Sequence, residues 1–406
     1  MYPASPLRSA PPLAAATSVS AAFARPGALR LGMVSTYPPK LCGLATFAAA
    51  LARELVAAGN RVDVVRVDDG DDPSWISGSE VARLVNGSAT SIRAAAAQLS
   101  RCDAVIIQHE YGIFGGADGD EVLDLMRATD APTIVVLHTV PLVPTEHQHD
   151  VLVEISRLAN RVVVMTEAAR DRLLEAYPVD PRIVVTIPHG ATLPAALPGE
   201  HDTSLEGRSA QLLTWGLLGP GKGIEHVIDA LSLLTDLPRR PHYTVAGVTH
   251  PKVFAARGDE YRHSLIRQGF VTGVAGAVEF DDDYRDLDGL TKFVASADIV
   301  VLPYDSVDQV TSGVLVDAVA AGRPVIATAF PHAVELLSSG AGIVVPHRDP
   351  AALASAIRAM VTQPTLLAEM TAEAQRLAPT MSWSHIAGLY AQLAQDLSAS
   401  LESAAM

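Results

Sequence analysis

Short apolar runs alternate with amphipathic stretches along most of this chain. Each run has the length of a strand and is almost continuous in Val, Ile and Leu, which is typical of strands covered on both faces. The runs are 29–36, 61–67, 103–109, 132–139, 161–166 and 182–188, then 211–216, 242–248, 277–281, 298–304, 324–328 and 342–346. The pattern therefore predicts parallel β-sheets.

The stretches between these runs have the period of an α-helix. In Thr46–Ala58, Phe47, Leu51 and Leu55 recur every four residues, and Gly59 stands where a helix would end. Further helices are predicted at about 311–322, 350–362 and 383–397. Strands and helices in alternation predict an α/β, doubly wound fold.

The alternation breaks at Ala191–Ser209, which is rich in Pro, Gly, Asp and Ser and has no periodicity. We therefore expect two Rossmann-like domains, at 29–192 and 210–378, with a linker at 193–209 and a cleft between them. The final segment, 379–406, carries one more helix. Residues 1–28 lack a continuous apolar core, so a disordered leader is expected rather than a secretory signal.

Composition and charge narrow the range of partners. The 406 residues carry a formal net charge of −15 and no basic cluster, which argues against a nucleic-acid partner. Cys42 and Cys102 give no disulfide framework and fit a reducing cytoplasm. No apolar run approaches the ~18 to 20 residues of a membrane span, and no basic amphipathic face suggests membrane docking.

Polar side chains follow several predicted strands. His109, Glu110 and Tyr111 follow one strand, and His138 and His189 stand at the ends of two others. In open parallel sheets, ligands bind outside the carboxyl ends of the strands, so these residues favour a polar ligand in the cleft. Each histidine alone is more often structural than catalytic. No set of four ligands is evident, so no metal site is expected.

The segment Gln309–Gly322 is the strongest candidate for binding an anion. A helix is predicted to start near Thr311 and Gly313, and its free N–H groups would suit a phosphate. Asp317 lies four residues after Gly313 and shares its helix face, where a carboxylate could accept hydrogen bonds from ribose. An ordinary capped helix with a surface aspartate explains the spacing equally well.

Two glycine-containing turns are weaker candidates. In Trp215–Gly223, Lys222 stands at a helix start, where a cation is unfavourable unless an anion shares the site. The turn is not a Walker P-loop, because Gly223 replaces the required Ser or Thr. Gly43 precedes another helix and would permit close approach of a phosphate or acceptor, although a plain strand-to-helix turn is an equally good reading.

Together these motifs resemble glycosyltransferase family 4, which has the two-domain GT-B architecture. The resemblance runs from about Leu29 to the C-terminal helix. YPPKLCGLATF resembles the family's glycine loop, LHT the strand end whose histidine contacts the donor sugar, and IPHG its V-I-P-N-G motif. GLLGPGKG resembles G-R-L-x-x-x-K-G, and SGVLVDAVAAG the end of the E-x7-E donor motif. SWSHIAGLY resembles the closing helix that crosses back to the first domain.

Three residues depart from the family pattern. Asp317 replaces the second glutamate of E-x7-E, Gln309 replaces the first, and Leu217 replaces an arginine that binds phosphate. The site therefore carries one negative and one positive charge fewer than usual. Because the two losses partly cancel, we interpret them as retuning of the site.

The resemblance implies a retaining hexosyltransferase, glucosyl or mannosyl, that uses a nucleotide diphosphate sugar and a hydroxyl acceptor, without a required cofactor or metal. Implied catalytic residues are His138, Lys222, Gln309 and Asp317. The implied donor-binding set is Gly43, Gly216, Gly221, Lys222, Tyr304, Thr311, Ser312, Gly313, Val314 and Asp317. The acceptor side would hold His109, Glu110, Tyr111 and His189. The alternatives are another GT-B enzyme, such as an epimerase or phosphorylase, and a donor-binding partner without turnover.

Overall fold

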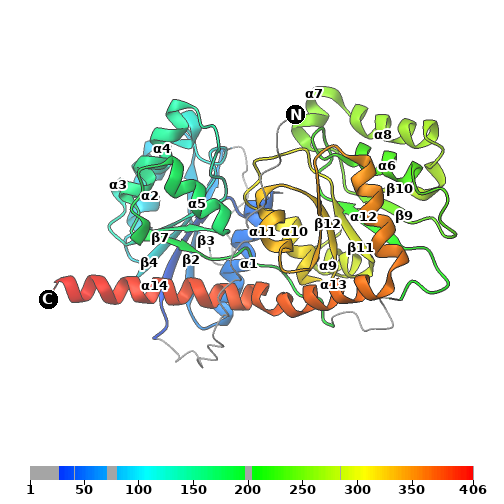
Figure 1. Cartoon of the computed structure of the whole chain (residues 1–406). Coiled ribbons are helices and arrows are strands. Elements are labelled where there is room, and N and C mark those ends of the chain that lie inside the picture. The colour runs from blue at the N-terminus through cyan, green and yellow to red at the C-terminus, as the bar shows by residue number, and fades with distance from the viewer. Residues whose placement is uncertain (1–26, 41, 71–79, 197–203, 284, 406) are drawn as a thin grey trace, which may run out of the picture.

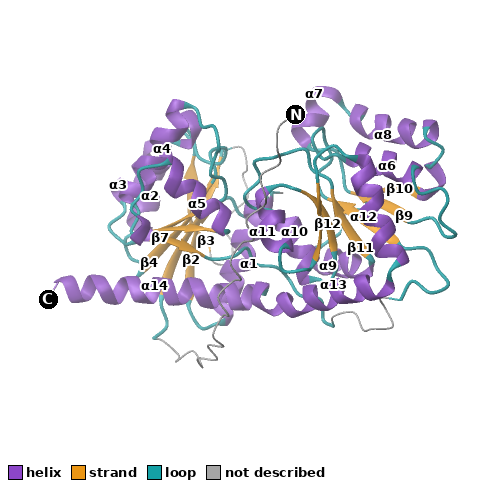
Figure 2. Ribbon diagram, viewed as in Figure 1, coloured by secondary structure: helices purple, strands orange, loops and turns teal. Residues whose placement is uncertain are grey.

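The computed structural model describes residues 27–40, 42–70, 80–196, 204–283 and 285–405. It contains two parallel sheets flanked by helices, one in each half of the chain (Figures 1 and 2). The strands of the first sheet are β1 (Arg30–Ser35), β2 (Arg61–Asp68), β3 (Glu80–Val85), β4 (Ala104–His109), β5 (Thr133–Leu137), β6 (Arg161–Val164) and β7 (Val184–Thr186). Those of the second are β8 (Gln211–Trp215), β9 (His242–Ala246), β10 (Val278–Asp281), β11 (Ile299–Leu302), β12 (Val325–Thr328) and β13 (Gly342–Val345).

Helices alternate with these strands along both halves. In the first half they are α1 (Gly43–Ala57), α2 (Ala89–Leu99), α3 (Glu121–Ala128), α4 (Glu146–Leu158) and α5 (Glu167–Ala176). In the second half they are α6 (Ile224–Ser232), α7 (Pro251–Arg257), α8 (Glu260–Val271), α9 (Leu287–Ser296), α10 (Gly313–Ala320), α11 (Pro331–Leu337), α12 (Pro350–Thr362), α13 (Pro364–Leu377) and α14 (Trp383–Ala405). The predicted pair of doubly wound α/β domains is confirmed.

The order of strands fixes where a ligand can bind. The first sheet has the order β3-β2-β1-β4-β5-β6-β7 and the second β10-β9-β8-β11-β12-β13. In each sheet the winding reverses between the first strand and the fourth, at β1/β4 and at β8/β11. Ligands bind at the carboxyl ends of strands beside such a reversal. The loops after β8 and β11 are the glycine-rich turn and the segment that leads into α10.

Among the described strands, β3 was not predicted by the pattern of apolar runs. β3 is an edge strand of sequence EVARLV, in which charged residues interrupt the apolar ones. Buried Glu80 lies beside the equally buried Arg66 of β2, so ionic groups take part in this edge of the sheet. An apolar-run criterion does not detect such a strand. Several other strands are also shorter than predicted, and Tyr304 lies in the loop after β11.

Apolar clusters cover both faces of each sheet. In the first domain, α2 to α5 pack on one face, while α1 and α14 cover the other. In the second domain, α6, α8 and α12 pack on one face and α9, α10 and α11 on the other. The linker falls between β7 and β8. The finer limits at 29–192, 193–209 and 210–378 stay a prediction, and residues 1–26 and 197–203 lie outside the described residues.

The last helix joins the two halves. α14 starts beside the linker, where Ser382 forms a β-bridge with Ala191, and then runs along the first domain (Figure 1). Its residues Ile386 and Tyr390 are fully buried against α1. Trp383 packs edge-on against Phe47 of α1 at 4.8 Å between ring centroids. No helix in the described part of the chain is long and apolar enough to cross a membrane.

Replacing Ile386 with alanine tests the docking of α14. Removing this fully buried side chain should lower the free energy of unfolding by about 3 kcal/mol, because the lost apolar contacts leave a cavity. Urea unfolding measures the change. Gln392→Ala, on the exposed face of the same helix, is the control and should stay close to wild type. Equal stability of the two variants would contradict this docking.

Candidate functional site

The start of α10 stands at the carboxyl end of β11. Ser312 caps the helix: its hydroxyl accepts a hydrogen bond from the N–H of Leu315 at 3.3 Å. The first-turn N–H groups of Gly313 and Val314 have no partner one turn back within the helix, as at every helix start. These N–H groups and the helix dipole favour an anion here.

A histidine that sequence reasoning missed holds this helix start in place. The ring Nδ1 of His332, on α11, accepts a hydrogen bond from the Ser312 N–H at 2.8 Å. Burial lowers the pKa of His332 to about 3, so the ring is neutral and can act as an acceptor. Nothing local in the sequence marks His332, since its partner is 20 residues away.

The loop before α10 contains polar groups without protein partners. The hydroxyls of Tyr304 and Thr311 are buried, and neither has a hydrogen-bond partner among the described residues. Buried orphan hydroxyls are uncommon and call for an explanation such as a ligand. The side-chain amide of Gln309 donates to the carbonyl of Thr311 at 3.1 Å, so it is folded onto its own loop.

Lys222 approaches this loop from the glycine-rich turn. Its Nζ lies 4.6 Å from the centroid of the Tyr304 ring, and burial lowers the pKa of its ammonium group. In the described part of the chain, no carboxylate lies within ion-pairing distance of Lys222. A desolvated ammonium group of this kind gains most from an incoming anion.

Backbone geometry fixes the position of Lys222. Gly221 and Gly223 have φ values of 89° and 66°, which glycine adopts without strain. A methyl group on Gly223 would lie 1.8 Å from the carbonyl oxygen of Pro303, so only glycine fits there. The N–H of Asp305 donates to the carbonyl of Gly221 at 2.9 Å. The two loops are therefore directly joined.

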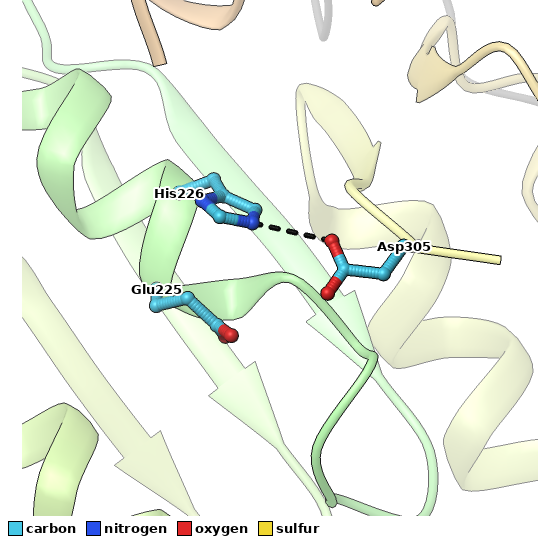
Figure 3. Close-up of side chains that lie close together, drawn as sticks. All are labelled: Glu225, His226 and Asp305. Carbon is cyan, nitrogen blue, oxygen red and sulfur yellow. Dashed lines mark hydrogen bonds and ion pairs between the residues drawn. The ribbon is translucent and has the colours of Figure 1, made fainter. Parts of the chain in front are cut away.

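A cluster of ionisable side chains lies where the glycine-rich turn meets the loop after β11. The His226 Nε2 lies 3.2 Å from the Asp305 carboxylate. Figure 3 shows these two side chains pointing toward one another, with Glu225 beside them. Their ligand atoms are close enough to hold a metal ion. However, Asp305 also pairs with Arg348 at 3.2 Å, and Glu225 accepts a hydrogen bond from the Tyr261 hydroxyl at 2.7 Å. We therefore assign the cluster to bracing the loop that carries Lys222.

Two histidines bring the first domain to this site. His189 lies against Gly313: a methyl group on Gly313 would stand 3.0 Å from the His189 Nε2. Phe47 packs edge-on against the rings of both His138 and His189, at 4.9 and 5.0 Å. Burial lowers the pKa of His138 to about 3 and that of His189 to about 4, so both are neutral.

The hydrogen bonds of His138 determine its free nitrogen. Its Nε2 lies 2.7 Å from the side-chain oxygen of the buried Gln108, an arrangement in which Nε2 carries the proton. The amide nitrogen of Gln108 in turn faces the Met33 sulfur at 3.7 Å. Nδ1 of His138 is then an acceptor, suited to a hydroxyl group of a ligand.

The predicted acceptor-side residues do not all reach the site. His109 is fully buried, and its ring packs against Tyr111 and Phe114. Glu110 accepts a 2.5 Å hydrogen bond from the Thr139 hydroxyl and orders the loop after His138. Tyr111 points toward α4, where its hydroxyl donates to the carbonyl of Gln148 at 3.2 Å.

The remaining glycines leave space beside the backbone. Gly43 opens α1 after the cap residue Cys42, whose sulfur accepts a hydrogen bond from the Ala45 N–H. A Cβ atom added to Gly43, Gly216 or Gly221 would meet no atom within 4 Å. Leu217, where the resemblance led us to expect an arginine, is 40% exposed. Lys222 is therefore the cation that the glycine-rich turn supplies.

Comparison with known proteins identifies the family of this chain. Residues 42–193 match the family model of Glycosyltransferase Family 4, and residues 209–363 match that of Glycosyl transferases group 1. The two matches together cover most of the chain. The protein belongs to the group 1, family 4 glycosyltransferases.

Individual relatives are more distant. A D-inositol 3-phosphate glycosyltransferase of Rhodococcus opacus (strain B4) is 27% identical over 56% of this chain and 51% of its own length. The chain spans about half the length of the curated relatives it matches. Among solved structures, Anabaena HepE in complex with UDP has a TM-score of 0.71 at 18% identity, covering 91% of this chain and 100% of that one. Sucrose-phosphate synthase of Thermosynechococcus elongatus has a TM-score of 0.67 at 18% identity, covering 92% and 100%. These structures show the GT-B fold.

Asp317 occupies a confined place. It lines a cavity of about 20 Å³ with Thr192, which follows β7, and with Leu287 and Thr291 of α9. That volume suits about one water molecule, so a ribose would need α9 or the segment around Thr192 to move aside. Burial raises the pKa of Asp317 to about 7. Its carboxylate therefore destabilises the free protein at neutral pH.

The pH dependence of an Asp317→Asn variant tests this environment. The unfolded carboxyl titrates near a pKa of roughly 4 and the folded one near 7. The native state thus binds more protons between these values, and the contribution of Asp317 to stability falls as pH rises through that window. The melting temperature of Asp317→Asn relative to that of wild type should rise between pH 5 and pH 8. The rise should be about 2–4 °C for each kcal/mol of unfolding free energy that wild type loses relative to the variant. The buried histidines are common to both proteins and cancel. A difference that does not change with pH would refute a raised pKa.

Proposed function

We propose that this glycosyltransferase transfers a hexose from a nucleotide diphosphate sugar to a hydroxyl group of a carbohydrate or polyol acceptor, with retention at the anomeric carbon. The observation that carries this proposal is Lys222, which lies against the Tyr304 ring, in the loop that leads into α10, and is a desolvated cation without a carboxylate partner among the described residues. Helix N–H groups and a lysine together suit a diphosphate. An anion would relieve the unfavourable placement of this cation.

The relatives support the same substrate classes. Several curated relatives are D-inositol 3-phosphate glycosyltransferases, which favours a polyol phosphate as the acceptor. HepE has been solved with UDP-glucose, which favours a uridine diphosphate sugar as the donor. We propose glucose or mannose as the hexose, since both fit a site lined by neutral hydrogen-bonding groups.

Each residue of the proposed site has a separate task. Lys222 and the N–H groups of Gly313 and Val314 bind the diphosphate, and Asp317 accepts a hydrogen bond from ribose. Nδ1 of His138 accepts a hydrogen bond from a sugar hydroxyl, and Gln309 contacts the sugar after its amide leaves Thr311. Gly43, Gly216 and Gly221 let the backbone approach the donor closely.

The reaction breaks the bond between the anomeric carbon and the diphosphate oxygen. The acceptor oxygen bonds to the same face of that carbon, and its proton passes to the departing phosphate oxygen. Charge develops on the leaving diphosphate, where the helix dipole and Lys222 stabilise it without rearrangement. Positioning of the two substrates supplies much of the remaining acceleration.

A specific observation favours a second candidate function, donor binding without turnover. Gln309 is neutral and folded onto Thr311, and Leu217 provides no charge to the phosphate. A panel of uridine, guanosine and adenosine diphosphate sugars, offered with inositol phosphates and simple sugars, separates the two functions. Product formation with any pair supports the transferase. Tight nucleotide binding without product across the panel supports the binding protein.

Replacing Lys222 with alanine tests its place at the diphosphate. The variant should lose about 10²-fold or more in kcat, because a preorganised charge at the leaving group is removed. Its melting temperature should not fall, since a buried lysine without a carboxylate partner adds little to folding. Steady-state kinetics and thermal unfolding measure both effects.

Lys292→Ala is the matched control, because Lys292 is an exposed lysine of α9 in the same domain. It should leave both kcat and stability unchanged. Full activity in Lys222→Ala would remove Lys222 from the reaction.

A further inference from the structure

The loop that carries Gln309 is held by the first domain as well as by its own. Arg172, on α5, has a side chain that is only 11% exposed. Its Nη1 donates to the carbonyl oxygen of Asp308 at 3.0 Å and pairs with the Asp308 carboxylate. This guanidinium group therefore holds Asp308, the residue directly before Gln309.

The same nitrogen of Arg172 also contacts the His138 loop. Nη1 donates to the carbonyl oxygen of Val140 at 3.0 Å, two residues after His138. The Asp308 carboxylate accepts a further hydrogen bond from the N–H of Leu142 at 3.4 Å. The two loops that carry the proposed sugar contacts, one from each domain, thus meet at a single guanidinium group.

The residue after Gln309 is anchored in a similar way. Val310 is 4% exposed and packs into the apolar core of the first domain. Its carbonyl oxygen accepts a hydrogen bond from the buried hydroxyl of Thr166 at 2.9 Å. Gln309 is therefore flanked on both sides by residues that the first domain holds, although it belongs to the second.

A third contact between the two domains involves α11. The Glu335 carboxylate accepts hydrogen bonds from the N–H groups of Glu167 and Ala168, at 2.9 and 2.8 Å, and so caps the start of α5. An anion at this position is favoured by the helix dipole. α5 thus contacts the second domain at the N-terminus of the helix, through Glu335, and along the side of the helix, through Arg172.

We propose that Arg172 is a positioning residue that assembles the sugar subsite across the domain interface. It holds the His138 loop and the Gln309 loop in one geometry, so that both can face the same hexose. The diphosphate subsite, with Lys222 and the α10 start, lies within the second domain and does not depend on Arg172. This inference rests on the proposed function and adds the residue that joins its two halves.

The test compares sugar-dependent and nucleotide-dependent steps in Arg172→Ala. Transfer should fall about 10²-fold in kcat/KM, because a small misplacement of the sugar contacts removes the productive geometry. The affinity for free nucleoside diphosphate, measured with UDP by calorimetry, should stay within about twofold of wild type. Arg172→Lys should recover part of the loss, since an ammonium group can still pair with Asp308. An equal loss of UDP affinity and transfer, or unchanged transfer, would overturn the proposal.

Two further variants keep the test decisive. Arg182→Ala removes an exposed arginine that pairs with Asp180 within the first domain, and it should behave as wild type. Asp308→Asn alters the exposed partner and should reproduce the kinetic split even if Arg172→Ala folds poorly. Because the two residues act as one unit, Arg172→Ala combined with Asp308→Asn should cost no more than Arg172→Ala alone. Additive losses would contradict the proposal.

Failure of the proposed function is distinguishable from failure of this inference. If wild type transfers no sugar in the panel, the transferase proposal fails. The positioning role is then read from binding: wild type should bind UDP-glucose and UDP with different affinities, and Arg172→Ala should abolish that difference. If the difference is the same in both proteins, Arg172 does not position the sugar contacts.

Discussion

The segment between β11 and α10 is held from several directions at once, and the rest of the site depends on that. The Tyr304 ring supports Lys222, the first domain holds Asp308 and Val310, and His332 fixes the N–H of Ser312. A helix start binds an anion only where its N–H groups face free space in a defined direction. His332 supplies that direction for the α10 start, and the hold on Asp308 and Val310 places the Gln309 loop where both domains can reach it.

Few of the residues assigned to the site are charged. Burial keeps His138, His189 and His332 neutral, so they offer hydrogen bonds without adding charge. Lys222 is a cation beside the loop that leads into α10, and Gln309 and Leu217 contribute no charge. In such a low-dielectric site, fixed dipoles and one desolvated ammonium group have a larger effect than they would in water. The changes at Gln309 and Leu217 therefore alter the local balance of charge while leaving the helix start intact.

Sequence pattern captured the features that local chemistry determines. The alternation of apolar runs gave both sheets apart from β3, and the Thr311–Gly313 stretch located a helix start that Ser312 caps. The glycines around Lys222 marked a turn whose φ values and close approach to Pro303 do require glycine. The family resemblance and its fold are confirmed. The tasks assigned to His138, Lys222, Gln309 and Asp317 stay proposals.

The features that sequence did not reveal depend on distant parts of the chain. Arg172 meets Asp308 across 136 positions, and Glu335 caps a helix of the other domain. No periodicity or spacing marks such pairs, because only the packing of the two domains brings them together. His109 shows the converse, since its place at a strand end suggested a ligand contact, but Tyr111 and Phe114 cover its ring. The direction of a side chain at a strand end depends on how the following loop folds over it.

The most direct test of this account is a crystal structure of the protein with UDP bound. We expect the β-phosphate to lie within hydrogen-bonding distance of the Gly313 N–H and the Lys222 ammonium group. Density for the diphosphate at another place, with the α10 start and Lys222 left free, would contradict it.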